Sequence, residues 1–155
     1  MSLERDITLL NRIGLFAELP GDQIRLLAFS AVRHELPAGT VLFQKGVLAK
    51  SGYVLSSGKI ELSDQIKGVR TVVATCDVGT LIGEMALLVD TPRPATATAI
   101  VDSEVMELSR ALMMRMFNEY PQVAVRMRGN IGDRLRSNIA ELWRIRAASF
   151  EGLPR

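Results

Sequence analysis

The 155-residue chain has few of the residues on which disulfide, metal and nucleophilic chemistry depend. Cys76 is its one cysteine, so no internal disulfide can form and a reducing compartment is expected. His34 is its one histidine, which excludes a metal site built from three histidines. A Cys–His or Ser–His dyad would have to use His34, and nothing near it in the sequence indicates a nucleophile. We therefore expect no catalytic residue, no metal site and no enzymatic activity.

Long apolar runs are also missing. No stretch approaches the ~20 apolar residues of a membrane helix, and the N-terminus lacks the apolar core of a signal peptide. Hydrophobic residues make up 48% of the chain and charged residues 23%, which is ordinary for a soluble globular protein. These features predict one cytoplasmic domain over residues 1–155 without a membrane span.

Charge is unevenly distributed along the chain. The first 105 residues carry 10 Lys and Arg against 12 Asp and Glu, whereas the last 50 carry nine against five. The basic character therefore belongs to the C-terminal third, where arginines recur at Arg126, Arg128, Arg134, Arg136, Arg144 and Arg146. This pattern fits either a solvated helix face or a contact with an acidic partner or membrane surface.

The middle of the chain, residues 31–108, has a β pattern. About eight short segments rich in Val, Thr, Ile and Leu are separated by turn residues every 8–12 positions. No alternating β–α–β pattern and no internal repeat occurs. The predicted fold class is therefore mainly β with flanking helices, with an eight-stranded antiparallel jelly-roll barrel at its centre.

Helical periodicity flanks this β region. Residues 1–30 predict two short helices, the second one capped by Gly21-Asp22. Ser109 is a credible N-cap for a helix within residues 109–148. Pro121 stands at the tolerated first position of a last helix that carries an apolar stripe, and Gly129 and Gly132 weaken it locally.

The segment 83–96 carries the strongest signal for a ligand. Gly83 precedes a short predicted helix, Glu84 to about Leu88, whose first free N–H groups can hold an anion. Arg93 adds a planar, permanently charged fork suited to phosphate. Ionised Glu84 only accepts hydrogen bonds, which suits a ligand hydroxyl. The segment thus favours a small ligand with a phosphate and a nearby hydroxyl.

Gly83-Glu84-Met85-Ala86-Leu87 followed by Pro92-Arg93-Pro94-Ala95-Thr96 resembles the phosphate-binding cassette of the cyclic-nucleotide-binding domain family. That family includes catabolite activator proteins, kinase regulatory subunits and cyclic-nucleotide-gated channels. The resemblance implies that Arg93 pairs with the cyclic phosphate and that Glu84 accepts from the ribose 2′-hydroxyl. N–H groups near Ala86 and Ala95 would add hydrogen bonds. The cassette residues of the predicted site are Gly83, Glu84, Met85, Ala86, Arg93, Pro94 and Ala95.

The same resemblance implies where the base lies. It would rest against Val72 and Val73, with the last helix closing over it as a lid. Arg134 on that helix could stack on a purine, or it could be only a solvated charge. Members selective for cyclic GMP often carry Thr or Ser directly after the cassette arginine. Pro94 stands there and offers no hydroxyl, so cyclic AMP is favoured over cyclic GMP.

One turn departs from the family pattern. Members often carry a glycine and an aspartate in the turn after the position of Gly46, and they use this turn to brace the cassette arginine. Ala49 and Lys50 stand at those places. The sequence therefore leaves open what supports Arg93.

These features predict a sensor domain that binds a cyclic nucleotide, needs no other cofactor, and signals to an unknown effector through its C-terminal helix. The alternative is a degenerate barrel that acts as a protein-interaction module without nucleotide. DNA binding is not expected, because the nine residues after Arg146 leave no room for a helix-turn-helix. The chain could be a monomer, or a dimer through the C-terminal helix around Trp143.

Overall fold

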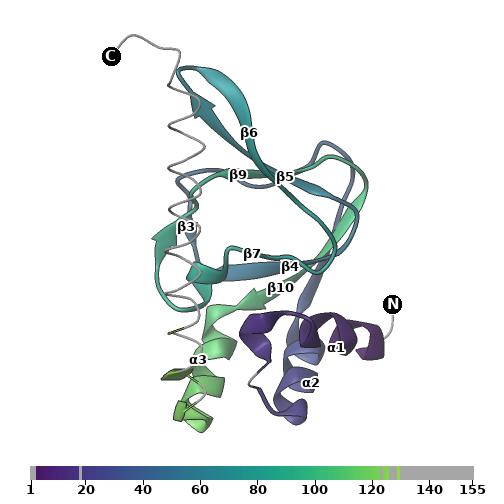
Figure 1. Ribbon diagram of the computed structural model, residues 1–155, viewed down its shortest axis with the longest axis vertical. Coiled ribbons are helices and arrows are strands. Elements are labelled where there is room, and N and C mark those ends of the chain that lie inside the picture. The colour runs from purple at the N-terminus through teal and green to yellow at the C-terminus, as the bar shows by residue number, and fades with distance from the viewer. Residues whose placement is uncertain (1–2, 18, 123, 126–128, 130–155) are drawn as a thin grey trace.

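The computed structural model describes residues 3–17, 19–122, 124–125 and 129. Within them, ten strands form the β region that the sequence predicts (Figure 1). They are β1 (Val32–Leu36), β2 (Val41–Phe43), β3 (Leu48–Ala49), β4 (Ser51–Ser57), β5 (Ile60–Ile66), β6 (Val69–Cys76), β7 (Leu81–Ile82), β8 (Thr91–Pro92), β9 (Thr96–Ala99) and β10 (Ser103–Ser109). Eight strands are predicted, and the two-residue strands β3 and β8 account for the difference.

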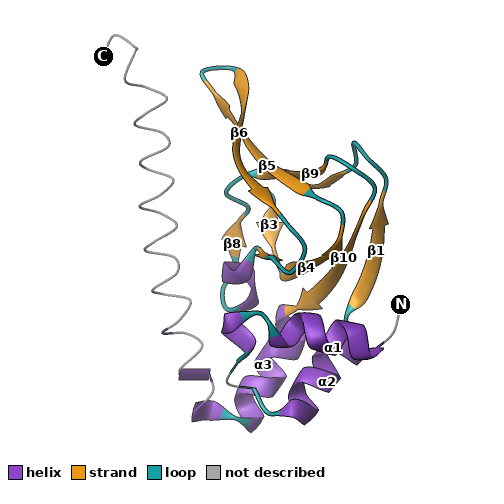
Figure 2. Cartoon of the chain, turned by 45° about the vertical axis from the view of Figure 1, so that its right-hand side comes forward, coloured by secondary structure: helices purple, strands orange, loops and turns teal. Residues whose placement is uncertain are grey.

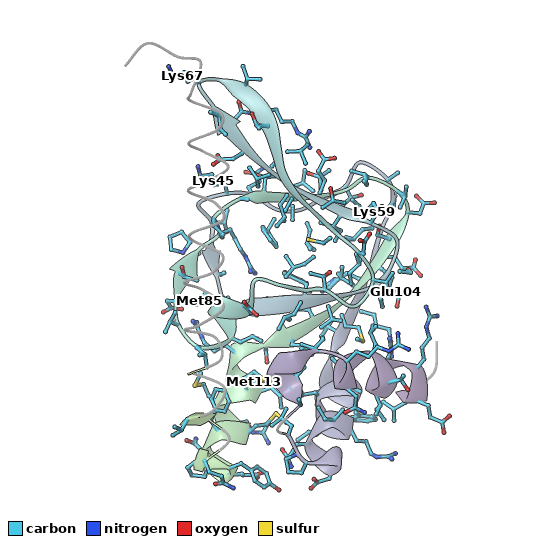
Figure 3. All side chains as sticks on the ribbon, in the orientation of Figure 1. Lys45, Lys59, Lys67, Met85, Glu104 and Met113 are labelled. Atoms are coloured by element: carbon cyan, nitrogen blue, oxygen red, sulfur yellow. The ribbon has the colours of Figure 1, made fainter. Side chains whose placement is uncertain are left out.

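The strands pair antiparallel in two four-stranded sheets, ordered β1-β10-β4-β7 and β2-β9-β5-β6, and in the small pair β3-β8. The two larger sheets face each other, as in a jelly roll (Figure 1). Apolar side chains from both fill the space between them, including Leu55 and Val105. Figure 3 shows side chains in the space between the two sheets. The predicted fold class is confirmed.

Helices cover the other face of the first sheet, at one end of the molecule (Figure 2). Val54 and Met106 alternate with the interior residues of β4 and β10 and pack against these helices. The central strands β4 and β10 are therefore buried on both faces, whereas the edge strand β1 is largely exposed. The helical elements are α1 (Leu3–Asn11), η1 (Gly14–Phe16), α2 (Gly21–Ser30), η2 (Glu84–Leu87) and α3 (Arg110–Glu119).

Of the two predicted helix N-caps, the one of α3 is present in the structure and the one of α2 is not. Ser109 is the N-cap of α3, and its hydroxyl accepts from the Leu112 N–H at 3.2 Å. For α2 the predicted cap at Gly21-Asp22 is wrong. The N-cap position is Pro20, which makes no side-chain cap bond, and Gly21 is already helical.

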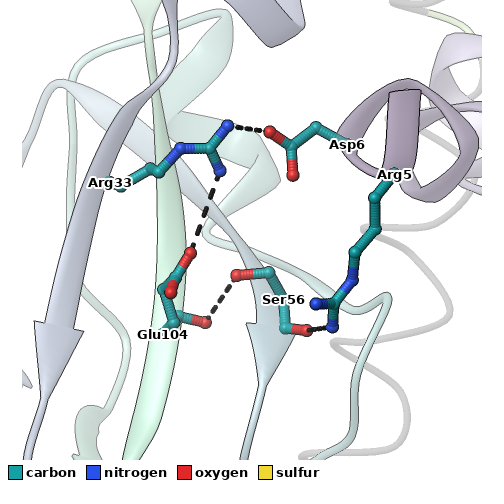
Figure 4. A network of polar contacts seen from close by, with 5 residues as sticks. All are labelled: Arg5, Asp6, Arg33, Ser56 and Glu104. Atoms are coloured by element: carbon teal, nitrogen blue, oxygen red, sulfur yellow. Dashed lines mark hydrogen bonds and ion pairs between the residues drawn. The ribbon is translucent and has the colours of Figure 1, made fainter. Parts of the chain in front are cut away.

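A polar network attaches α1 to the barrel (Figure 4). The carboxylate of Asp6, only 1% exposed, binds the guanidinium of Arg33 on β1. Arg33 Nη1 also lies 3.8 Å from the carboxylate of Glu104 on β10. Arg5 donates to the backbone oxygen of Ser56, and the Ser56 hydroxyl donates to the backbone oxygen of Glu104. The N-terminal helix is therefore linked to β1 by an ion pair and to β4 by a hydrogen bond.

Most of the predicted last helix lies outside the described residues, and so do Arg134 and Trp143. Its start is described, because the Ala124 N–H donates to the Tyr120 oxygen at 3.2 Å. Among the helices of the described residues, none combines the length and the apolar character that crossing a membrane requires.

Candidate functional site

The predicted cassette begins directly after β7. Gly83 adopts a left-handed conformation, with φ of 78° and ψ of 38°, and η2 follows as one 3-10 turn over Glu84–Leu87. The predicted short helix is therefore present, in a tighter form. It ends before β8, whose residues Thr91 and Pro92 pair with Ala49 and Leu48 of β3. The turn is thus held between two short strands.

Arg93 leaves β8 and turns its side chain into the protein, where the residue is only 5% exposed. Its guanidinium carbon lies 4.3 Å from the centre of the Phe43 ring and 5.4 Å from that of Tyr53. Nη2 donates to the backbone oxygen of Ser51 at 2.8 Å. Nη1 is buried without a hydrogen-bond partner among the described residues. Buried polar groups are nearly always paired, so this unpaired nitrogen is an exception within the described residues.

Gly83 makes room for that nitrogen. A Cβ atom at Gly83 would lie 2.3 Å from Arg93 Nη1. The sequence alone assigns this glycine to the close approach of a ligand, whereas in the structure Arg93 itself makes the close approach. The positive φ of Gly83 also disfavours any side chain there. Conformation and space both require glycine at this position.

Backbone hydrogen bonds hold Arg93 to the turn after β2. The Gly46 N–H donates to the Arg93 oxygen, and the Arg93 N–H donates to the Val47 oxygen, each at 2.8 Å. The Lys45 N–H donates to the Thr96 hydroxyl at 3.0 Å. The support that the sequence leaves open at Ala49 and Lys50 therefore comes from this turn and from the Ser51 carbonyl.

Next to Arg93, four polar residues form a cluster on the inner face of the first sheet that sequence reasoning missed as a group: His34, Ser51, Tyr53 and Glu107. Burial lowers the pKa of Arg93, while Tyr53 and Glu107 act to raise it. Burial also acts to raise the pKa of Glu107, but hydrogen bonds from Ser51, His34 and Tyr53 outweigh it, and the net shift is downward. Glu107 is therefore ionised at neutral pH. The sequence did hold a signal for this cluster. On each of three strands, a polar residue lies two positions from an apolar one and therefore on the same face of the strand.

The other predicted cassette residues lie around this turn. Glu84 and Met85 are half-buried, Ala86 and Ala95 are buried, and Pro94 is exposed. The Ala86 N–H, predicted to meet a phosphate, donates to the Gly83 oxygen at 3.1 Å in this structure. The cassette thus brings together the predicted residues, with one N–H engaged internally.

Val72 and Val73 lie on β6, on the opposite sheet. Val72 pairs with Ser63 and Ala74 pairs with Leu62, so Val73 is the extra residue of a β-bulge. Val72 is 46% exposed and Val73 is half-buried. No direct contact with the cassette follows from this pairing, and their role toward a base stays a prediction. Across the described ranges, His, Cys, Asp and Glu side chains form no group of three suited to a metal ion.

The family model described as the cyclic nucleotide-binding domain matches residues 33–120, from β1 to the end of α3. The chain belongs to this family. The match covers both sheets and the whole cassette, and it confirms the family predicted from residues 83–96.

Individual members of the cyclic nucleotide-binding domain family are similar over most of the chain. The Cyclic AMP receptor protein of Thermus thermophilus is 31% identical over 129 residues, which is 83% of this chain. A cyclic nucleotide-binding-like protein from Brucella abortus is 37% identical, with a TM-score of 0.68 over 73% of this chain and 97% of its own. The regulatory domain of Toxoplasma gondii PKA, solved with cAMP, is 28% identical, with a TM-score of 0.69 over 76% of this chain and 43% of its own.

The curated relatives are longer than the chain. It spans 60% of the Thermus protein and 7% of the lysophospholipase NTE1 of Chaetomium globosum, which it matches at 30% identity over 106 residues. The similarity to that enzyme is therefore confined to a small part of its length.

Proposed function

We propose that this domain is a sensor that binds a cyclic nucleotide, with Arg93 pairing with the cyclic phosphate. The observation that carries the proposal is the buried Arg93 Nη1, which has no hydrogen-bond partner among the described residues. A phosphodiester is a permanent anion with free acceptor oxygens, and a charge-assisted hydrogen bond from Nη1 would satisfy both groups. Family membership supports a cyclic nucleotide as the ligand. The cassette, which backbone hydrogen bonds hold in place, supports the same ligand class.

The remaining cassette residues define the rest of the ligand. Glu84, first residue of η2 and next to Gly83, would accept from the ribose 2′-hydroxyl. The N–H groups at Ala86 and Ala95 would reach the phosphate, which requires Ala86 to leave the Gly83 oxygen. Pro94 supplies no hydroxyl for a guanine amino group, so we propose cyclic AMP as the preferred ligand.

Signalling would use the C-terminal helix. In this proposal the base contacts Val72 and Val73, the helix closes over it, and Arg134 stacks on the purine. The helix can report binding only if its closed position gains contacts with the ligand that its open position lacks. The effector that reads this movement is a protein or a further domain.

A calorimetric titration of the purified chain with cyclic AMP, cyclic GMP and 5′-AMP tests the proposal. Tight binding of cyclic AMP, weaker binding of cyclic GMP and negligible binding of 5′-AMP are expected. If cyclic GMP bound as tightly as cyclic AMP, the proposed preference for cyclic AMP would be wrong. Absence of heat with all three, after nucleotide carried through purification is removed by refolding, would leave an interaction module without a ligand.

A further inference from the structure

A cluster of polar side chains, the Glu107 cluster, lies against Arg93 and consists of His34, Ser51, Tyr53 and Glu107. The Ser51 hydroxyl donates to Glu107 Oε2 at 2.7 Å. His34 Nε2 lies 2.9 Å from Glu107 Oε1. Both carboxylate oxygens are therefore engaged, one by β4 and one by β1.

The strand register places this cluster on the inner face of the first sheet. Glu107 lies directly opposite Tyr53, and Val105 lies directly opposite Leu55. Val105 and Leu55 belong to the interior core, and residues two apart on a strand share a face. Glu107 and Tyr53 therefore point to the same side as the core, where the Arg93 guanidinium lies over the Tyr53 ring.

Ser51 connects the carboxylate to the arginine. Its hydroxyl donates to Glu107, while its backbone oxygen accepts from Arg93 Nη2. Among the ion pairs of the described residues, none joins Glu107 to Arg93. The carboxylate is therefore linked to the arginine through Ser51, and its negative charge also attracts the buried guanidinium directly.

We propose that Glu107 is a positioning residue for ligand binding. By fixing Ser51, it keeps Arg93 Nη2 on the Ser51 carbonyl and leaves Nη1 directed toward the ligand. This inference rests on the proposed function, because its consequence is the affinity for cyclic nucleotide. Fixed orientation matters here because hydrogen bonds from a guanidinium weaken steeply when they are misaligned.

The first test is the affinity of Glu107→Gln for cyclic AMP, measured by displacement of a fluorescent cyclic AMP analogue. Glutamine keeps the size of the side chain but gives up the carboxylate that accepts from both Ser51 and His34. Binding about 5- to 10-fold weaker is expected, which corresponds to about 1–1.4 kcal/mol. The matched control is Glu104→Gln on the same strand, whose carboxylate contacts Arg33, and its affinity should stay within twofold. Unchanged or tighter binding by Glu107→Gln would overturn the inference.

A smaller change tests the same link in case Glu107→Gln folds poorly. Ser51→Ala removes the hydroxyl and keeps the carbonyl that accepts from Arg93, so about two- to threefold weaker binding is expected. Affinity equal to that of the unmutated chain would contradict a role for Ser51 between Glu107 and Arg93.

A double-mutant cycle separates positioning from general support of the fold. Arg93→Lys keeps a charge but lacks the fork that contacts Ser51 and the phosphate together. In this background Glu107→Gln should change the affinity by less than twofold. An equal loss in both backgrounds would mean that Glu107 only supports the fold. If the unmutated chain bound cyclic AMP but Glu107→Gln matched it, this inference alone would fail, whereas failure of the unmutated chain to bind would remove both.

Discussion

At the residue scale, Gly83 and Arg93 depend on each other. Gly83→Ala would place a Cβ 2.3 Å from Arg93 Nη1, so the guanidinium must move. We expect cyclic AMP binding at least about 10-fold weaker, because displaced charge-assisted hydrogen bonds cost more than about 1.4 kcal/mol. Calorimetry measures the affinity.

Gly39→Ala provides the matched control for this change. Gly39 has a similar φ of 91°, but nothing lies within 4 Å of its Cβ position. Both variants should lose about 1–2 kcal/mol of unfolding free energy from backbone strain, and only Gly83→Ala should lose affinity. Comparable affinity in the two variants would contradict the contact with Arg93.

Glu107 should also make stability depend on pH. Its pKa is lowered in the folded protein, so ionised Glu107 stabilises the fold above the unfolded-state pKa of about 4.3. This contribution is lost as pH falls through the lower folded-state value. In urea unfolding, the difference between the unmutated chain and Glu107→Gln should therefore be largest near pH 7 and shrink below about pH 4. A difference independent of pH would argue against an ionised Glu107.

The sequence was sufficient to predict a cassette at residues 83–96 but not the Glu107 cluster. Gly83, Glu84 and Arg93 lie within eleven consecutive positions, so local spacing reveals them. His34 and Glu107 come from strands 73 residues apart, and they meet only because β1 pairs with β10 in one register. A shift of that register by one residue would point each side chain to the other face.

At the scale of secondary-structure elements, the N-cap of α3 stabilises this helix, which follows the barrel. Ser109→Ala would remove the hydroxyl that accepts from the Leu112 N–H. The expected loss is about 1 kcal/mol of unfolding free energy, measured in urea. Ser30→Ala, at the exposed end of α2, is the control and should change stability by less than about 0.5 kcal/mol. Equal stability of both variants would contradict the cap.

Elements with strong patterns were predictable, and the small pair β3-β8 was not. The capping serine and the alternating strands follow from local chemistry. The pair β3 and β8 has two residues in each strand, and Leu48–Ala49 and Thr91–Pro92 meet only after the chain has folded. The start of α2 was misplaced by one residue because Pro20 takes the cap position without a side-chain hydrogen bond.

At the scale of the whole molecule, the buried Asp6 links the N-terminal helix to the barrel. Asp6→Ala would leave Arg33 without its nearest carboxylate, and about 2 kcal/mol of unfolding free energy should be lost. This loss of unfolding free energy is smaller than that expected for a fully buried ion pair, because Arg33 is 34% exposed. Thermal and urea unfolding measure the loss, with exposed Asp22→Ala as the control. Equal loss in both variants would contradict a specific link.

The central claim is that the buried Arg93 holds the phosphate of a cyclic nucleotide. The most direct measurement is calorimetric titration of Arg93→Ala with cyclic AMP, beside the unmutated chain and Arg25→Ala, an exposed arginine on α2. We predict that Arg93→Ala binds about 30- to 1,000-fold more weakly, from a loss of about 2–4 kcal/mol, and that Arg25→Ala binds normally. Binding of cyclic AMP by Arg93→Ala with the affinity of the unmutated chain would contradict the claim.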